Sequence, residues 1–356
     1  MPLIVDGGRV PPRWAERKNL LATAPLDTHT SADCVTLAFV NNMPDSALED
    51  TEIQFFELLD AASGDVPVLL SLHSLAGVVR GERGQHHVNS FYQGTDDLLN
   101  RRFDGVIMTG TEPRQRDLRI EPYWSAMVNV LDWAETNTVS TILSCLAAHA
   151  GVLHGDGIDR RPLRDKQFGV FDFAKVASHP LSRGTGERIR FPHSRWNEVS
   201  ADALAACGYS VLAQSAEGGV DSFIKMKKRS LFVHFQGHPE YGAQTLLKEY
   251  RRDIKRFLRK ERETYPSMPK GYFDGASTKL VTEFQDVVLS DRREELIEGF
   301  PEASLAGALT KTWHSSATAI YRNWLCYVVS NKAQLPEFSA VAVARENVER
   351  KRSALR

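Results

Sequence analysis

Apolar segments alternate with longer mixed segments along the first half of the chain, and this alternation predicts strands separated by helices. Four apolar stretches have the length and residue types of buried strands: CVTLAFV, VPVLLSLHSL, FDGVIMTG and TVSTILS. Helices are predicted between or after them, over 47–62, 122–137 and 145–155. Apolar strands joined by helices are typical of an α/β fold, with a mainly parallel sheet covered by helices on both faces.

The second half of the chain is less regular. Residues 160–230 contain short β-like pieces joined by turns with glycine and proline. Helices are predicted over 243–263, near 277–306 and over 308–332. The pattern predicts one domain over 33–330, followed by a charged tail over 331–356. Residues 1–32 are polar and interrupted by prolines, so we expect an arm there rather than a core element.

Composition narrows the function classes. The chain has 356 residues and a formal net charge of −1, so the basic excess expected of a nucleic-acid-binding domain is missing. Its four cysteines are scattered without the spacing of a zinc site, and we expect no metal. The N-terminus has no apolar signal segment, and no stretch approaches the roughly 20 apolar residues of a membrane span. These features predict a soluble, cytoplasmic protein that binds neither nucleic acid nor membrane.

One cysteine, Cys145, lies at a position that favours a reactive thiolate. Cys145 in STILSCLAAHAG joins a predicted strand to a predicted helix, where free amides and the helix dipole favour a thiolate. The amide of Leu146 would point at an oxyanion formed there, and Thr111, in the turn after the neighbouring strand, could supply a second donor. The alternative is a buried structural thiol, as we expect for the other three cysteines.

A second candidate is the histidine–glutamate pair in FVHFQGHPEYG. His238 and Glu240 are two residues apart, and on an extended segment such residues project from the same side. A carboxylate beside an imidazole fixes its tautomer and raises its basicity. The alternative is an exposed polar pair at a strand end. In parallel sheets, however, reactive residues gather at the carboxyl ends of strands, so we expect this pair to meet Cys145.

Several further segments, in order, resemble the homoserine O-acyltransferase (succinyl- or acetyltransferase) family of methionine biosynthesis. They include FVNNMPDSALEDTEIQFFELL, DKQFGVF, FPHSRWNEV, GHPEYGAQTLLKEYRRDI and YRNWLCYVV. The resemblance runs from about residue 35 to 330, with a longer helical insertion at 277–306. It implies a flavodoxin-like fold akin to class I glutamine amidotransferases, a homodimer, and acyl-CoA as co-substrate with no permanently bound cofactor.

The resemblance also implies residue roles. Cys145 would take the acyl group as a thioester in a ping-pong reaction, with His238 as general base and Glu240 orienting it. Lys166, Ser194 and Arg252 would contact the amino-acid substrate, although Arg252 alone could equally belong to a solvated basic helix face. At the family's acyl-specificity position, glutamate accompanies acetyl transfer and glycine succinyl transfer.

This chain has Arg114 at that position, and a cation there favours succinyl-CoA over acetyl-CoA.

The sequence leaves three alternative functions open. The chain has Ser-Ser-Ala near 315–317 where the family has His-Gly-Asn, so the acceptor could be another hydroxy amino acid such as L-serine. A glutamine amidotransferase-like Cys-His-Glu hydrolase is a second alternative, and a non-catalytic binder of an amino acid or CoA is a third.

Overall fold

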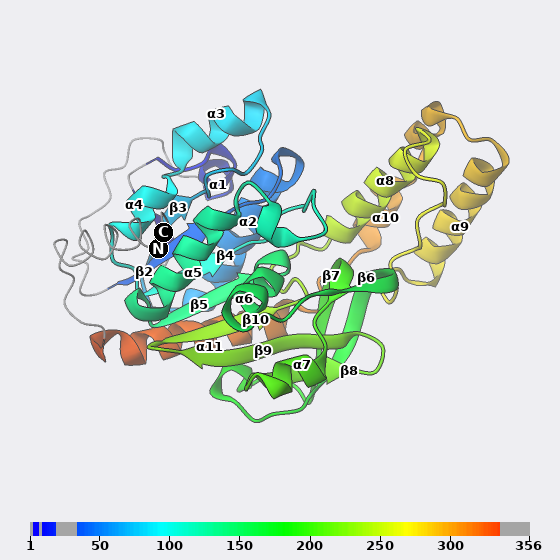
Figure 1. Cartoon of the computed structure of the whole chain (residues 1–356). Coiled ribbons are helices and arrows are strands. Elements are labelled where there is room, and N and C mark those ends of the chain that lie inside the picture. Colours follow the sequence, from blue (N-terminus) through cyan, green and yellow to red (C-terminus); the bar gives the residue numbers. More distant parts are fainter. Residues whose placement is uncertain (1–2, 7–8, 19–33, 335–356) are drawn as a thin grey trace.

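A single mixed sheet lies at the centre of the molecule (Figure 1), whose computed structural model describes residues 3–6, 9–18 and 34–334. Its strands run parallel in one half and antiparallel in the other. The parallel half has the order β1 (Leu3–Val5), β3 (Val68–His73), β2 (Val35–Val40), β4 (Gly105–Met108), β5 (Ser140–Ser144) and β10 (Ser230–Phe235). The antiparallel half continues with β9 (Gly219–Lys227), β8 (Ser210–Ser215), β6 (Arg161–Lys175) and β7 (Arg188–Glu198).

Helices cover both faces of the parallel half, which confirms the predicted α/β architecture. The helices α2 (Asp45–Ser63) and α11 (His314–Asn331) share one apolar core with the sheet. The helices α4 (Thr95–Leu99), α5 (Trp124–Asn137) and α6 (Leu146–Asp156) share the second core on the opposite face. The shorter elements are α1 (Pro12–Arg17), α3 (Glu82–Phe91), α7 (Ala201–Ala206), η2 (Leu118–Ile120), η3 (Pro180–Ser182) and η5 (Lys332–Gln334).

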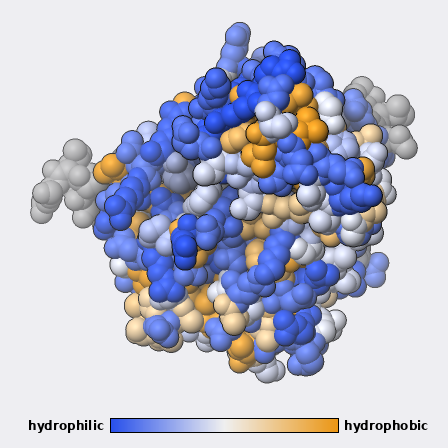
Figure 2. All heavy atoms as spheres, turned by 90° about the vertical axis from the view of Figure 1, so that its right-hand side faces the viewer, coloured by the Kyte–Doolittle hydropathy of each residue, from blue (hydrophilic) through white to orange (hydrophobic). Residues whose placement is uncertain are grey.

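A helical lobe projects to one side of the sheet (Figure 1). It contains α8 (Thr245–Leu258), α9 (Gly275–Ser290), η4 (Glu294–Gly299) and α10 (Glu302–Ala308). Region 277–306 is therefore helical as predicted, but broken into three pieces. Figure 2 shows this side of the molecule as mainly hydrophilic, with an apolar patch near its top. Three apolar side chains of α9 are exposed, those of Leu280, Val287 and Leu289.

The prediction that residues 1–32 contribute no core element is wrong for the described part of that segment. Strand β1 pairs in parallel with β3, and its Leu3 and Val5 are buried. Trp14 of α1 is 2% exposed and packs edge-on against Phe56 of α2, with 5.5 Å between ring centroids. Residues 19–33 and the tail 335–356 lie outside the described residues. None of the described helices is both long and apolar enough to cross a membrane.

The contact of Trp14 yields a stability prediction. Replacing Trp14 with alanine removes a large buried ring and leaves a cavity, so we expect the free energy of unfolding to fall by about 3–5 kcal/mol. Urea unfolding measures the change. The control is Arg13→Ala, because Arg13 is exposed and only ion-pairs Asp50 at 2.8 Å; it should cost less than about 1 kcal/mol. Equal and small effects of both changes would show that α1 is not part of the folded core.

Candidate active site

Cys145 occupies the predicted junction between a strand and a helix. It follows β5 directly and precedes the first residue of α6, with φ of 52°. A residue other than glycine with positive φ costs on the order of 1–3 kcal/mol and persists only where its surroundings hold it. Here the Cys145 amide donates a 2.7 Å hydrogen bond to the carbonyl of Phe235, at the end of the neighbouring β10. The strained turn leaves the side chain partly accessible.

The start of α6 lies against the turn that follows β4. A Cβ atom on Gly110 would come within 2.8 Å of the Leu146 nitrogen and 2.7 Å of its Cβ, so only glycine allows this approach. The first amides of a helix have no partner within it, and the helix dipole adds positive potential. The two predicted oxyanion donors, the amides of Leu146 and Thr111, thus belong to segments in contact beside Cys145.

His238 and Glu240 are adjacent, although not for the predicted reason. Strand β10 ends at Phe235, so both residues lie in the loop after the strand and not on an extended strand face. His238 Nδ1 is 2.8 Å from Glu240 Oε1, and the His238 amide donates to the Pro192 carbonyl at 2.8 Å. The turn through Pro239, rather than strand alternation, brings the two side chains together.

The imidazole of His238 is also held by stacking and by the thiol. Its ring lies on the ring of Tyr241, with centroids 4.1 Å apart and planes 18° from parallel. Because Glu240 occupies Nδ1, Nε2 is the nitrogen left for the hydrogen bond with Cys145. Ser144 donates a further hydrogen bond to Glu240 Oε1, at 3.4 Å. The side chains of Cys145, His238 and Glu240 are therefore linked in series by hydrogen bonds.

Electrostatics set His238 apart from the other buried histidines. Burial lowers the pKa of His149 to about 3 and that of His193 to about 4. Burial also lowers the pKa of His238, but the negative charges of Glu240 and Cys145 and its hydrogen bonds to both raise it well above its usual value. The site therefore favours a protonated imidazole next to the sulfur.

The three predicted substrate residues also meet. Ser194 on β7 donates a 2.5 Å hydrogen bond to Glu249 on α8. Lys166 Nζ on β6 lies 3.1 Å from Asp253 and 3.6 Å from Glu249. Arg252 is 3.1 Å from Asp253 and 3.7 Å from Glu249, with 43% of its side chain exposed. The cations Lys166 and Arg252 thus flank the carboxylates of Glu249 and Asp253 in one polar cluster. The alternative, in which Arg252 belongs only to a solvated basic helix face, does not describe these contacts.

Sequence reasoning missed the residues that join this cluster to His238, Glu240 and Cys145. Tyr241 stacks on His238, and its hydroxyl donates to Glu249 Oε1 at 2.9 Å. Glu249 in turn accepts from Ser194. A signal was available, because Glu249 and Asp253 are four residues apart and share one face of a basic helix.

Comparison with known protein families fits this arrangement. The family model described as homoserine O-succinyltransferase matches residues 16–335. The chain belongs to the homoserine O-succinyltransferase family. It is therefore an enzyme of the acyltransferase class, as the resemblance in its sequence predicts.

Individual relatives cover most of the chain. The homoserine O-succinyltransferase of Rhodopseudomonas palustris is 42% identical over 317 residues, which are 87% of this chain and 95% of that protein. That of Bradyrhizobium japonicum is 40% identical over 335 residues, or 92% of this chain and 99% of that protein. Among solved structures, a glutamine amidotransferase of Thermotoga maritima covers 84% of this chain and 99% of its own, at 12% identity and a TM-score of 0.45.

Arg114, at the predicted acyl-specificity position, lies in the loop after β4, which hydrogen bonds to Glu121 hold together. Its amide and that of Gln115 both donate to Glu121 Oε1, each at 2.6 Å. The Arg114 side chain is exposed. Its influence on the acyl group stays a prediction.

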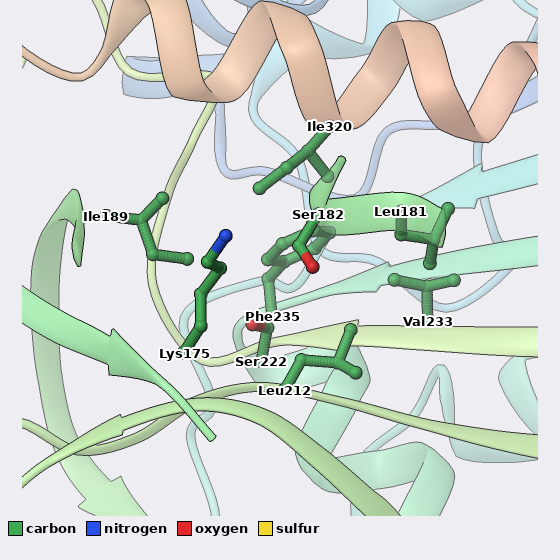
Figure 3. Close-up of a pocket in the computed structure, with 9 residues that line it drawn as sticks. All are labelled: Lys175, Leu181, Ser182, Ile189, Leu212, Ser222, Val233, Phe235 and Ile320. Carbon is green, nitrogen blue, oxygen red and sulfur yellow. The ribbon is translucent and has the colours of Figure 1, made fainter. Parts of the chain in front are cut away.

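Within the described ranges, no group of three or more His, Cys, Asp or Glu side chains could hold a metal ion. A small pocket lies under α11, lined mainly by apolar side chains together with Lys175 (Figure 3). Of the site residues named above, Phe235 lines it, while Cys145, His238 and Glu240 do not. The pocket is thus distinct from the cluster of these three side chains.

The pKa of His238 yields a prediction about its protonation. Burial lowers this pKa, but Glu240 and Cys145 raise it well above its usual value, so the imidazole should keep its second proton above about pH 6.5, where an ordinary histidine loses it. Nitrogen NMR of the imidazole between about pH 6 and 9 measures the titration, and His238→Gln assigns the signal. Cys145→Ala should lower the pKa of His238, because it removes one of the two negative charges that raise it. A wild-type midpoint near pH 6.5 would contradict the raised pKa.

Proposed function

We propose that this protein transfers the succinyl group of succinyl-CoA to the side-chain hydroxyl of L-homoserine, a step of methionine biosynthesis. The relatives named above carry that activity in their names. The observation that carries the proposal is the chain from Cys145 through His238 to Glu240, continued by Tyr241 to an acidic and basic cluster. A nucleophile, a base and a polar cluster with charges of both signs for a zwitterion are the parts this reaction needs.

The first displacement uses the protonated imidazole. The thiolate of Cys145 attacks the thioester carbon of acyl-CoA and forms a new C–S bond. As the bond to CoA breaks, the departing sulfur takes the proton from His238, which becomes neutral. The amides of Leu146 and Thr111 stabilise the oxyanion of the tetrahedral intermediate. The products of this step are acyl-Cys145 and CoA.

The second displacement restores the starting state. Neutral His238 takes the proton of the acceptor hydroxyl, whose oxygen attacks the acyl carbon. The ester C–O bond forms, and the C–S bond to Cys145 breaks with release of the thiolate. Glu240 keeps Nδ1 protonated, so Nε2 faces the reacting atoms in both steps. The order of steps is ping-pong.

Acceptor recognition is assigned to the cluster on α8, β6 and β7. Arg252 offers a planar, bidentate partner for the carboxylate of the amino acid, and Glu249 offers a negative charge for its ammonium group. Lys166 and Ser194 hold Glu249 in place. L-homoserine is our proposed acceptor. L-serine, one methylene shorter, is the comparison substrate. The homodimer and the cytoplasmic location stay predictions.

The thioester can be tested directly. Mixing the protein with succinyl-CoA should place one succinyl group on Cys145, and intact-protein and peptide mass spectrometry should find it there. Addition of L-homoserine should discharge it. Cys145→Ala should form no adduct and lose turnover, while Cys207→Ala, a control at another cysteine, should behave as the wild type. Absence of the adduct, or glutamine hydrolysis by the wild type, would overturn the proposal in favour of a different chemistry.

The assignment of Arg252 predicts a split between the two half-reactions. In Arg252→Gln, loss of a charged hydrogen-bond partner should raise KM for L-homoserine about 10- to 100-fold, while the rate of thioester formation stays unchanged. The neighbouring Arg251→Gln is a matched control, because Arg251 pairs with Glu302 outside the cluster. Slower acylation of Cys145 in Arg252→Gln, with unchanged KM for the acceptor, would contradict the assignment.

A further inference from the structure

A second arginine, Arg160, interacts electrostatically with Cys145, and most of its N–H donors have no hydrogen-bond partner among the described residues. Arg160 is half-buried in the segment between α6 and β6. Its Nη2 donates to the carbonyls of Gln115 at 3.2 Å and Arg116 at 3.1 Å. Within the described part of the chain it forms no ion pair, and Nε and Nη1 have no hydrogen-bond partner. Since an arginine carries five N–H donors, most of its capacity for an anion remains.

The position of Arg160 follows from the contacts of the loop it holds. The loop after β4 includes Gly110, which lies against the first residue of α6, Leu146. The same loop accepts two hydrogen bonds from Arg160 and is closed by Glu121. Arg160 therefore binds the loop that runs beside Cys145, on the side where we place the acyl end of a thioester. The charge of Cys145 and that of Arg160 interact, and this interaction opposes the lowering of the Arg160 pKa by burial.

A second polar group, the hydroxyl of Tyr123, interacts electrostatically with Arg160. Tyr123 is 3% exposed, and its hydroxyl has no hydrogen-bond partner among the described residues. A buried hydroxyl without a partner is costly, and a ligand that accepts its hydrogen bond removes that cost. The negative charge of Glu121 also lies here, but its Oε1 is engaged by two amides.

The other arginines near the site do not offer the same capacity. Arg195 also interacts with the charge of Cys145, but it is 4% exposed. Its Nε, Nη1 and Nη2 are all used, by His193 and by the carbonyls of Asn197 and Gly218. Arg114 has an exposed side chain. Of the three, Arg160 alone combines closeness to Cys145 with unused donors.

We propose that the guanidinium of Arg160, together with the hydroxyl of Tyr123, binds the free carboxylate of the succinyl group while that group is attached to Cys145. This subsite rests on the proposed succinyl transfer and identifies what selects the donor. An acetyl group has no carboxylate to occupy it. A guanidinium binds a carboxylate through two parallel hydrogen bonds, which positions the acyl chain as well as binding it.

The test compares two acyl donors in single-turnover experiments. Acylation of Cys145 by succinyl-CoA and by acetyl-CoA is followed by mass spectrometry in the wild type and in Arg160→Gln, Arg160→Lys and Tyr123→Phe. Arg160→Gln should slow acylation by succinyl-CoA about 10- to 100-fold, as expected for a lost charged hydrogen bond. Acylation by acetyl-CoA should change less than about twofold, because the lost contact is absent in that donor. Arg160→Lys should restore part of the preference.

Arg161→Gln is the matched control, because Arg161 is the exposed neighbour of Arg160 and pairs with Glu198, and it should leave the ratio of the two rates unchanged. Arg114→Gln decides between the two candidate arginines. Equal slowing of both donors in Arg160→Gln, or a change of preference in Arg114→Gln alone, would overturn the subsite while acyl transfer stands. A wild type that prefers acetyl-CoA would do the same. A wild type that forms no adduct with either donor would overturn the proposed function and this subsite together. Acetyl-CoA acylation also reports that each variant is folded.

Discussion

The backbone turn at Cys145 is the constraint on which the site depends. A positive φ at a residue with a side chain is unfavourable alone. It is maintained because β5 and β10 are paired in register up to the Ser144–Phe235 pair, and because the amide of Cys145 continues that ladder to the carbonyl of Phe235. The sheet therefore sets the direction of the sulfur, and α6 supplies free amides at the same point. A change that shifted β10 against β5 would move the nucleophile.

The site combines the two halves of the sheet. Cys145 comes from the parallel half, and Lys166 and Ser194 come from the antiparallel half. His238 and Glu240 follow β10, the strand where the two halves join. In the proposed function, acylation belongs to one side of this junction and acceptor recognition to the other, with the base between them. This arrangement suits a reaction in which one imidazole serves two successive displacements.

Part of this organisation could be predicted from sequence because it depends on local patterns. The strand ending at Ser144 and the small residues after Cys145 mark a strand–helix junction, and the structure has it. The N-terminal strand was missed because three apolar residues, Leu3–Val5, are too short a signal among prolines and charges. Helix α3 was missed because its only buried residue is Gly84, so no apolar face marks it.

Contacts between distant segments escaped sequence reasoning for a different reason. The stacking of Tyr241 on His238 and its bond to Glu249 depend on how the loop after β10 turns back to α8. The orientation of Arg160 towards the loop after β4 depends on the path of the chain after α6. Neither has a periodicity or a spacing that a single sequence reveals. The sequence predicts that His238 and Glu240 lie side by side, and they do. The predicted reason, alternation along a strand, is wrong, because both residues lie in the loop after β10.

The contacts from His238 through Tyr241 to Glu249 have a consequence for the proposed acceptor. Stacked rings and a 2.9 Å hydrogen bond fix the separation between the imidazole and the charged cluster proposed to bind the two charged ends of that acceptor. In the proposed function, this separation sets the side-chain length that reacts. An amino acid whose hydroxyl is one carbon closer to its charged ends would be anchored equally well, yet its oxygen would stop short of the imidazole.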